Sequence, residues 1–375
     1  MDCKVSPAKK NERPFNASLT LLVFGAVATV GYVDYVVDTV SLGYLYVLPL
    51  ALGAFVFRLR ISLGLVFICF ILQDLLGPFA HAGWQHIMRN LATLIAFVVV
   101  VVVVDRLVGQ RIQLTELVRI QRDELAQEIE LAAQVQQRLL PARPPVMNGF
   151  DIAGQMIAAR TVGGDYFDYI NLPAGDLGLV VADVSGKGVA AALLMSSVEM
   201  ALRIDAPSAS HTNQVVRDLN KVLAHVTDAE RYVTLFYGKL DVSQCLLEYT
   251  NAGHLPPLLV RQGTREPAWL EAGGTVTGLF PEAAYDCGQV RLEPGDTLIL
   301  YTDGVTEATN AAGEQFTVER LVALVRENPT SSAQDLVETI LKAVGEFRGA
   351  NALEDDLTLM VLRVTGDLPQ TNLSS

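Results

Sequence analysis

The sequence has few cysteines, and its C-terminal part has few basic residues. The four cysteines, at positions 3, 69, 245 and 287, match neither the spacing of a metal site nor that of a disulfide framework, so we expect a reducing, cytosolic environment. Residues 111–375 carry 20 Lys and Arg against 35 Asp and Glu. Because binding to nucleic-acid phosphates is driven largely by basic side chains that displace counterions, this balance argues against a nucleic-acid partner.

The N-terminal part lacks charged side chains over long runs. Four runs approach the roughly 20 apolar residues that a helix needs to cross a bilayer, at 17–33, 39–57, 61–80 and 91–104. Buried helices of a soluble protein are the alternative, but four helices without polar faces would leave no element to cover them. We therefore predict a transmembrane region of four spans over residues 1–104. The first span is not a cleaved signal peptide, because no clear cleavage site follows it and further spans do.

Basic residues mark the predicted cytoplasmic ends of these spans. Lys and Arg precede the first span, fill the turn between the second and third, and follow the fourth, whereas Asp34 and Asp38 lie between the first and second. Since cytoplasmic loops are enriched in Lys and Arg, we expect a multi-pass protein of the inner membrane with both termini in the cytoplasm. Asp74, near one end of the third span, is a candidate for signal sensing, with an interfacial position as the alternative.

Residues 105–145 are rich in Gln, Glu, Arg and Leu and have no proline before Pro141. A seven-residue repeat of apolar positions runs through them, at Val118, Leu125, Ala132 and Leu139. A second set of positions, three residues after each of the first type, holds Leu114 and Val135, and Gln121 and Glu128 interrupt it. The repeat predicts a coiled-coil-like helical linker that joins a homodimer, and a solvated spacer helix is the alternative. The prolines of 141–145 would end this helix.

Residues 146–366 mix strand and helix patterns without regular alternation, which predicts one α+β domain. Strands are expected at 177–182, 232–240, 246–250, 297–301 and 357–364, and helices at 189–203, 212–226, 318–327 and 333–347. Short turns between neighbouring strands indicate antiparallel hairpins. We therefore expect a sandwich of antiparallel sheets flanked by helices, followed by a disordered tail at 367–375.

Acidic residues stand at the ends of several predicted strands. Asp168 ends the segment VGGDYFD, Asp183 and Asp303 follow apolar runs, and Asp355 and Asp356 precede one. Any one of these aspartates could simply form a turn. Carboxylates from several converging strand ends would instead make an oxygen-rich pocket, which suits hard divalent cations such as Mg²⁺ or Mn²⁺.

Two glycine-containing segments match nucleotide-related motifs only in part. SGKG at 185–188 has Val181 and Gly188 where a phosphate-binding loop needs Gly and then Ser or Thr. GGDYF at 163–167 has Tyr166 where the GGDEF signature of diguanylate cyclases has an acidic residue. Neither motif explains the remaining aspartates.

Five ordered blocks resemble the PPM family of metal-dependent serine/threonine phosphatases, in its bacterial SpoIIE-like and RsbU-like branch. The blocks are VGGDYFD (162–168), ADVSGKGVAAALLM (182–195), NAGHLPPLL (251–259), YTDGVTEA (301–308) and DDLTLMVL (355–362), and AAQVQQRLLP (132–141) precedes them. The resemblance covers about 135–364. It implies an αββα sandwich that holds two Mn²⁺ or Mg²⁺ ions between its sheets.

Carried over residue by residue, the resemblance implies a set of metal ligands. Asp183 would bridge both ions, and the Val184 carbonyl would complete one of the two sites. Asp165 would support the first ion, and Asp303 and Asp355 would bind the second. These four aspartates are the expected catalytic residues.

Four neighbouring residues have two interpretations each. Arg160 stands where a related branch of the family has a phosphate-holding arginine, or it is an exposed surface residue. His254 could act as an acid near the leaving group, or it packs within its loop. Lys187 could attract a phosphoprotein, or it is solvated. Asp356 would face solvent or bond to a neighbouring turn, where an amide would serve as well.

The resemblance therefore implies a membrane-anchored phosphoprotein phosphatase that is controlled through its linker helix. Its substrate would be a phosphorylated regulatory protein such as an anti-sigma factor antagonist. A catalytically inactive phosphoprotein-binding sensor is one alternative, and the intact acidic set argues against it. A membrane-bound nucleotide cyclase is another, but it would need a nucleotide-binding loop that the sequence does not show.

Overall fold

The computed structural model describes residues 17–37, 42–76, 84–227, 231–264 and 266–366. The chain forms two compact units, Met1–Glu124 and Leu125–Ser375. One helix, α4 (Trp84–Gln137), runs through the boundary between them. The predicted tail at 367–375 lies outside the described residues.

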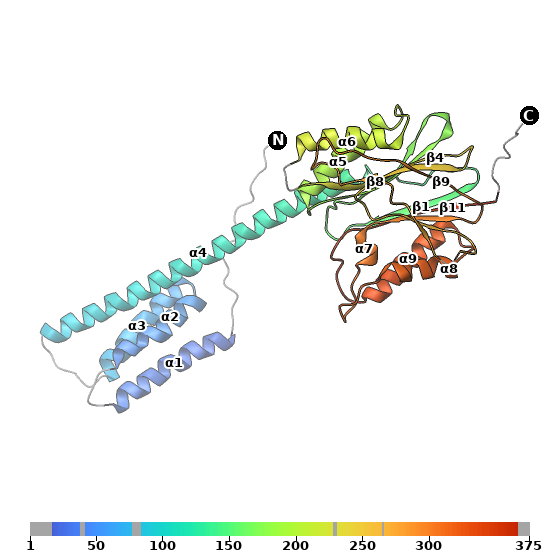
Figure 1. Cartoon of the computed structure of the whole chain (residues 1–375). Coiled ribbons are helices and arrows are strands. Elements are labelled where there is room, and N and C mark those ends of the chain that lie inside the picture. Colours follow the sequence, from blue (N-terminus) through green and yellow to red (C-terminus); the bar gives the residue numbers. More distant parts are fainter. Residues whose placement is uncertain (1–16, 38–41, 77–83, 228–230, 265, 367–375) are drawn as a thin grey trace, which may run out of the picture. The chain divides into compact units, whose positions relative to one another are not determined.

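The N-terminal unit consists of apolar helices (Figure 1). They are α1 (Ala17–Val36), the 3-10 helix η1 (Gly43–Tyr46), α2 (Val47–Val56), α3 (Leu59–Leu76) and the first part of α4. α1, α3 and the Ile87–Gln137 part of α4 are long and apolar enough to cross a membrane, whereas Gly43–Val56 is shorter. Three of the four predicted spans thus correspond to long helices, and the count of four stays a prediction. Residues 39–41 and 77–80 of the predicted spans lie outside the described residues.

The fourth predicted span and the linker form one uninterrupted helix, α4. The helix ends at Gln137, four residues before Pro141, in agreement with the expected effect of the prolines. Several apolar side chains near its end remain exposed, including Leu125, Leu131 and Val135. This exposure is compatible with a partner helix, and the dimeric coiled coil stays a prediction.

Two sheets form the centre of the C-terminal unit. The first sheet has the order β1-β11-β10-β6-β7, and the second β2-β3-β4-β5-β8, with β9 paired to β5. Neighbouring strands are antiparallel except for the short β5–β8 pair. The bounds are β1 Phe150–Ile157, β2 Tyr166–Asn171, β3 Leu177–Val184, β4 Val233–Asp241, β5 Leu246–Ala252, β6 Leu258–Val260, β7 Ala268–Trp269, β8 Gly273–Gly274, β9 Gly288–Arg291, β10 Thr297–Tyr301 and β11 Leu357–Val364.

Helices cover both outer faces of this sandwich (Figure 1). α5 (Val189–Asp205) and α6 (Thr212–Val226) pack on the second sheet, and α8 (Val318–Glu327) and α9 (Ala333–Arg348) on the first. Side chains alternate along each strand, so Met360 and Leu362 of β11 enter the core between the sheets while Leu359 and Val361 pack under the helices. The predicted α+β sandwich of two antiparallel sheets flanked by helices is confirmed.

Most predicted elements of this domain are present, but several strands were not anticipated. β1, β2 and the short strands β6 to β9 were missed, as were the short helices η2 (Pro173–Gly175) and α7 (Asp303–Thr306). The placement of Asp168 at a strand end was wrong, because Asp168 lies inside β2 and is fully buried. Its carboxylate accepts hydrogen bonds from the Tyr166 hydroxyl at 2.8 Å and pairs with Arg203 of α5 at 2.7 Å. Asp168 thus joins α5 to the second sheet.

Candidate active site

Asp183 is the next-to-last residue of β3, at the edge where the chain turns toward α5. The turn that follows contains Gly186 and Gly188, whose φ angles of 99° and 82° lie in the left-handed region. Glycine adopts this conformation without the steric cost of a Cβ atom. The apolar run of β3 and this glycine turn therefore fix Asp183 at the rim of the sandwich.

Asp303 and Asp355 come to the same region from the other sheet. Asp303 begins α7 directly after β10, and Asp355 lies two residues before β11. β10 and β11 are hydrogen-bonded neighbours, so the two carboxylates share one edge. A Cβ atom on Gly304 would lie 2.0 Å from the Asp356 carbonyl oxygen, which explains why glycine follows Asp303.

Asp165 lies on the loop before β2 and is 2% exposed. Its Oδ2 atom accepts hydrogen bonds from the Thr302 hydroxyl at 2.7 Å and the Thr358 hydroxyl at 2.6 Å. These two threonines belong to the segments that carry Asp303 and Asp355, so they orient Asp165 from the opposite sheet. The sequence interpretation missed this role, although both threonines stand in the quoted motifs.

The carboxylates are close enough to repel one another. Burial, and then the charges of Asp303 and Asp355, raise the pKa of Asp183 to about 6. Burial, and then the charge of Asp183, raise the pKa of Asp165 well above its usual range. Burial and Asp355 likewise raise the pKa of Asp303. The four predicted aspartates therefore form one acidic cluster, and such a cluster favours a bound cation or protons.

The donor atoms of this cluster suit a hard divalent cation. Gly164 leaves room beside them, because its Cβ would lie 2.9 Å from the Val184 carbonyl oxygen and 3.7 Å from Asp183 Oδ1. Carboxylate and carbonyl oxygens are the ligands preferred by Mg²⁺ and Mn²⁺. Within the described ranges, no three His, Cys, Asp or Glu side chains surround a single point as metal ligands do. The chemistry of the donor atoms fits these ions.

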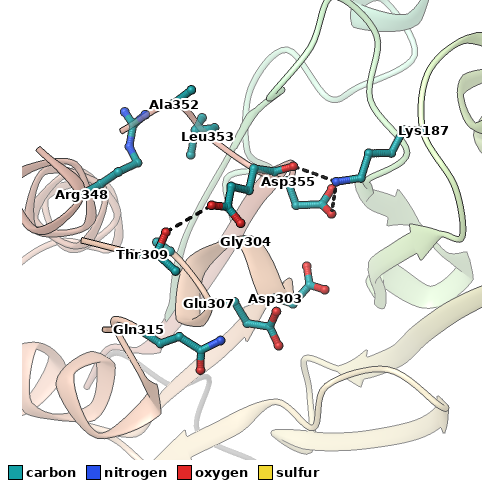
Figure 2. Close-up of a pocket in the computed structure, with 12 residues that line it drawn as sticks. Lys187, Asp303, Gly304, Glu307, Thr309, Gln315, Arg348, Ala352, Leu353 and Asp355 are labelled. Atoms are coloured by element: carbon teal, nitrogen blue, oxygen red, sulfur yellow. Dashed lines mark hydrogen bonds and ion pairs between the residues drawn. The ribbon is translucent and has the colours of Figure 1, made fainter. Parts of the chain in front are cut away.

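Lys187 supplies positive charge to one side of the cluster (Figure 2). Its Nζ atom lies 2.8 Å from Asp355 Oδ2 and donates a hydrogen bond to the Glu354 carbonyl at 2.7 Å. It also lowers the pKa of Asp303, against the larger effects that raise it. A pocket of about 170 Å³ opens beside this ion pair, and Glu307 and Arg348 contribute to its lining. Lys187 therefore pairs with a predicted metal ligand and is not simply solvated.

Arg160 and His254 occupy different environments. Arg160 is exposed on the loop between β1 and β2 and forms no ion pair with the described residues. His254 is buried, with Nδ1 2.9 Å from the Thr234 hydroxyl and Nε2 3.2 Å from the Tyr301 carbonyl oxygen. Burial lowers the pKa of His254 to about 4. These contacts favour the loop-packing interpretation of His254, and substrate binding by Arg160 stays a prediction.

Asp356 follows one of its two sequence interpretations. It does bond to a neighbouring turn, because its carboxylate accepts hydrogen bonds from the backbone N–H groups of Ala159 at 2.8 Å and Gly164 at 2.6 Å. Both carboxylate oxygens are used. An amide has only one acceptor oxygen, so we predict, against the expectation from the sequence, that it would not serve equally well.

The sandwich and its acidic rim define a PP2C-type phosphatase domain. Solved structures of such domains have the same fold. The SiaA-PP2C domain of Pseudomonas aeruginosa has the same fold, with a TM-score of 0.57 at 20% identity over 64% of this chain and 98% of that one. The RsbU and RsbW domains of Rv1364c from Mycobacterium tuberculosis match with a TM-score of 0.53 at 28% identity, over 60% of this chain and 64% of that chain.

Sequence comparison identifies the branch. The profile of the family described as Stage II sporulation protein E (SpoIIE) matches residues 173–365. The phosphoserine phosphatase RsbU of Bacillus subtilis (strain 168) is 34% identical over 244 residues, which cover 64% of this chain and 71% of RsbU. The chain belongs to the SpoIIE family and is a protein serine/threonine phosphatase.

Proposed function

We propose that this protein is a membrane-anchored, Mn²⁺- or Mg²⁺-dependent phosphatase that dephosphorylates a regulatory protein. The observation that carries the proposal is the convergence of Asp165, Asp183, Asp303 and Asp355 from both sheets on one rim. The phosphoserine activity in the name of RsbU supports a phosphoserine substrate. An anti-sigma factor antagonist is the substrate class that the resemblance suggests.

In the proposed mechanism these residues bind the metal ions or fix the orientation of the residues that bind them. Asp183 would bridge two ions, with Asp165 and the Val184 carbonyl on one side and Asp303 and Asp355 on the other. Bound dications lower the pKa of water and neutralise charge on phosphoryl oxygens. Thr302 and Thr358 hold the buried Asp165 side chain in one orientation. No side chain of the chain needs to form a covalent intermediate.

Control through the linker is supported by a contact at the end of α4. Gln136 is buried and pairs with the backbone of Gly163 in both directions. Its Nε2 atom donates to the Gly163 carbonyl at 2.7 Å, and the Gly163 N–H donates to its Oε1 atom at 3.1 Å. Gly163 is two residues before Asp165. A shift of α4 at this point would therefore move the loop that carries a predicted metal ligand.

The remaining parts of the proposal concern the membrane and the assembly. The long apolar helices α1, α3 and α4 support insertion in the inner membrane. The distribution of Lys and Arg supports a cytoplasmic catalytic domain. Exposed apolar residues along α4 support a homodimer joined through this helix.

The proposal is tested on the full chain with a phosphoserine-containing protein and Mn²⁺. We expect turnover that is abolished by excess EDTA and restored by added Mn²⁺. Asp183→Asn is expected to lower turnover by at least ~100-fold without unfolding the protein, because it removes charge from a ligand shared by both ions. Turnover that persists in EDTA would refute the metal mechanism. Substrate binding without turnover in the wild type would favour the inactive sensor instead.

A further inference from the structure

The N-terminal unit contains buried polar atoms without partners. Among the described residues, five buried side-chain polar atoms lack a hydrogen-bond partner, and three of them belong to this unit. They are Asp34 Oδ2, the Tyr46 hydroxyl and Gln73 Oε1. Asp34 and Tyr46 are 1% and 0% exposed. In an apolar surrounding, an unpaired polar atom costs free energy, so a bound polar species is expected to satisfy these three atoms.

These three side chains come from different helices but meet at one place. Asp34, on α1, uses Oδ1 to accept a hydrogen bond from the Leu42 N–H at 2.7 Å. The next residue is Gly43, and the Gln73 side chain of α3 fills the space that a Cβ atom there would need.

Tyr46 reaches the same place from the end of η1. Its hydroxyl lies 3.2 Å from the position of a Cβ atom on Gly31, one turn before Asp34 on α1. It is also close enough to Asp34 for the two groups to interact electrostatically. The side chains of Asp34, Tyr46 and Gln73 therefore lie near one another, and each has an unpaired oxygen atom.

The charge of Asp34 has no oppositely charged partner among the described residues, although its side chain is buried. Asp74, the sensing candidate from the sequence, differs because its Oδ1 atom accepts a hydrogen bond from Asn90 Nδ2 at 2.7 Å and its side chain is exposed. The buried Asp34 is therefore a better candidate for a sensing residue than the exposed Asp74.

We propose that Asp34, Tyr46 and Gln73 bind a small monovalent cation, Na⁺ or K⁺. Carboxylate, hydroxyl and amide oxygens are ligands that hard cations accept. One positive charge neutralises Asp34, whereas a divalent ion would leave a net charge in apolar surroundings. The close packing at Gly31 and Gly43 favours an ion over an organic ligand. Under the predicted topology this end of α1 faces away from the cytoplasm, so the site would report on external ions.

The test measures thermal unfolding of the full chain in lipid nanodiscs, in NaCl, KCl or N-methylglucamine chloride at equal ionic strength. We expect Na⁺ or K⁺ to raise the midpoint temperature in a saturable way, because a ligand that binds only the folded state stabilises it. Asp34→Asn should abolish this dependence, since it removes the charge. Tyr46→Phe should raise the half-saturating concentration several-fold. Tyr44→Phe is the matched control, because Tyr44 lies on the same 3-10 helix and is 63% exposed.

The possible outcomes separate the proposal from its rivals. If Asp34→Asn fails to fold, Tyr46→Phe and Gln73→Leu still report on the site. Unfolding of the wild type that is identical in all three salts would overturn the proposal and leave a buried water or a protonated carboxyl group at the site. An equal effect of Na⁺ on wild type and Asp34→Asn would also overturn it. Because no measurement uses phosphatase activity, failure of the proposed function would not affect the result.

Discussion

Replacement of Asp356 by asparagine is expected to loosen the loop between β1 and β2. The carboxylate is buried and accepts backbone hydrogen bonds on both oxygens, from Ala159 on Oδ1 and from Gly164 on Oδ2, with a longer bond of 3.5 Å from Asp165 on Oδ2. An amide keeps one acceptor and turns its NH₂ group toward the other N–H. Loss of one hydrogen bond to a charged acceptor costs about 1.5–3 kcal/mol. A loss of ~2 kcal/mol corresponds to roughly 30-fold more frequent opening of the loop.

Hydrogen exchange measures this opening directly. In the Asp356→Asn variant of the full chain, the amides of Ala159 and Gly164 are expected to exchange about 30-fold faster, while those of β11 change little. Asp218→Asn is the matched control, because Asp218 is a partly exposed aspartate of α6 that pairs with Lys221. Unchanged protection of Ala159 and Gly164 in a folded variant would refute the reasoning and show that an amide serves equally well.

Two further substitutions address the ion pair at the rim and the end of the linker helix. Lys187→Met is expected to tighten Mn²⁺ binding several-fold in calorimetry, because the ammonium group no longer occupies Asp355 Oδ2; weaker binding would contradict this competition. Gln136→Leu removes both hydrogen bonds to Gly163. Because such a bond typically contributes ~1 kcal/mol, the Mn²⁺ concentration needed for half-maximal turnover is expected to rise at least ~3-fold. Gln134→Leu, two residues away on an exposed face of α4, is the control, and an equal effect of both changes would count against the linker contact.

Strands and helices whose own apolar residues are buried could be predicted from the local sequence pattern. The prediction of 357–364 agrees with β11 because every residue of that strand is buried, some between the sheets and others under α9. The helix at 212–226 agrees with α6, whose apolar residues recur on one face. In both cases the signal lies within the element itself.

The missed features depend on contacts between distant residues. Asp168 was counted among the carboxylates at strand ends because it ends a motif, but it lies inside β2 and its partner Arg203 lies 35 residues away on α5. Gln136 received no role, because its contact with Gly163 exists only after α4 docks on the domain. Carboxylates with the same local sequence pattern thus serve different purposes, and only the tertiary structure separates them.

The attachment of Asp165 to Thr302 and Thr358 has a consequence for how the enzyme matures. Its loop leads into one sheet, and the two hydroxyl groups that hold it belong to the other. An intermediate with one sheet formed would lack part of the acidic cluster, and so would a proteolytic fragment that ended before β10. Phosphatase activity should therefore appear only with the last step of assembly, so a newly synthesised chain stays inactive until both sheets have docked.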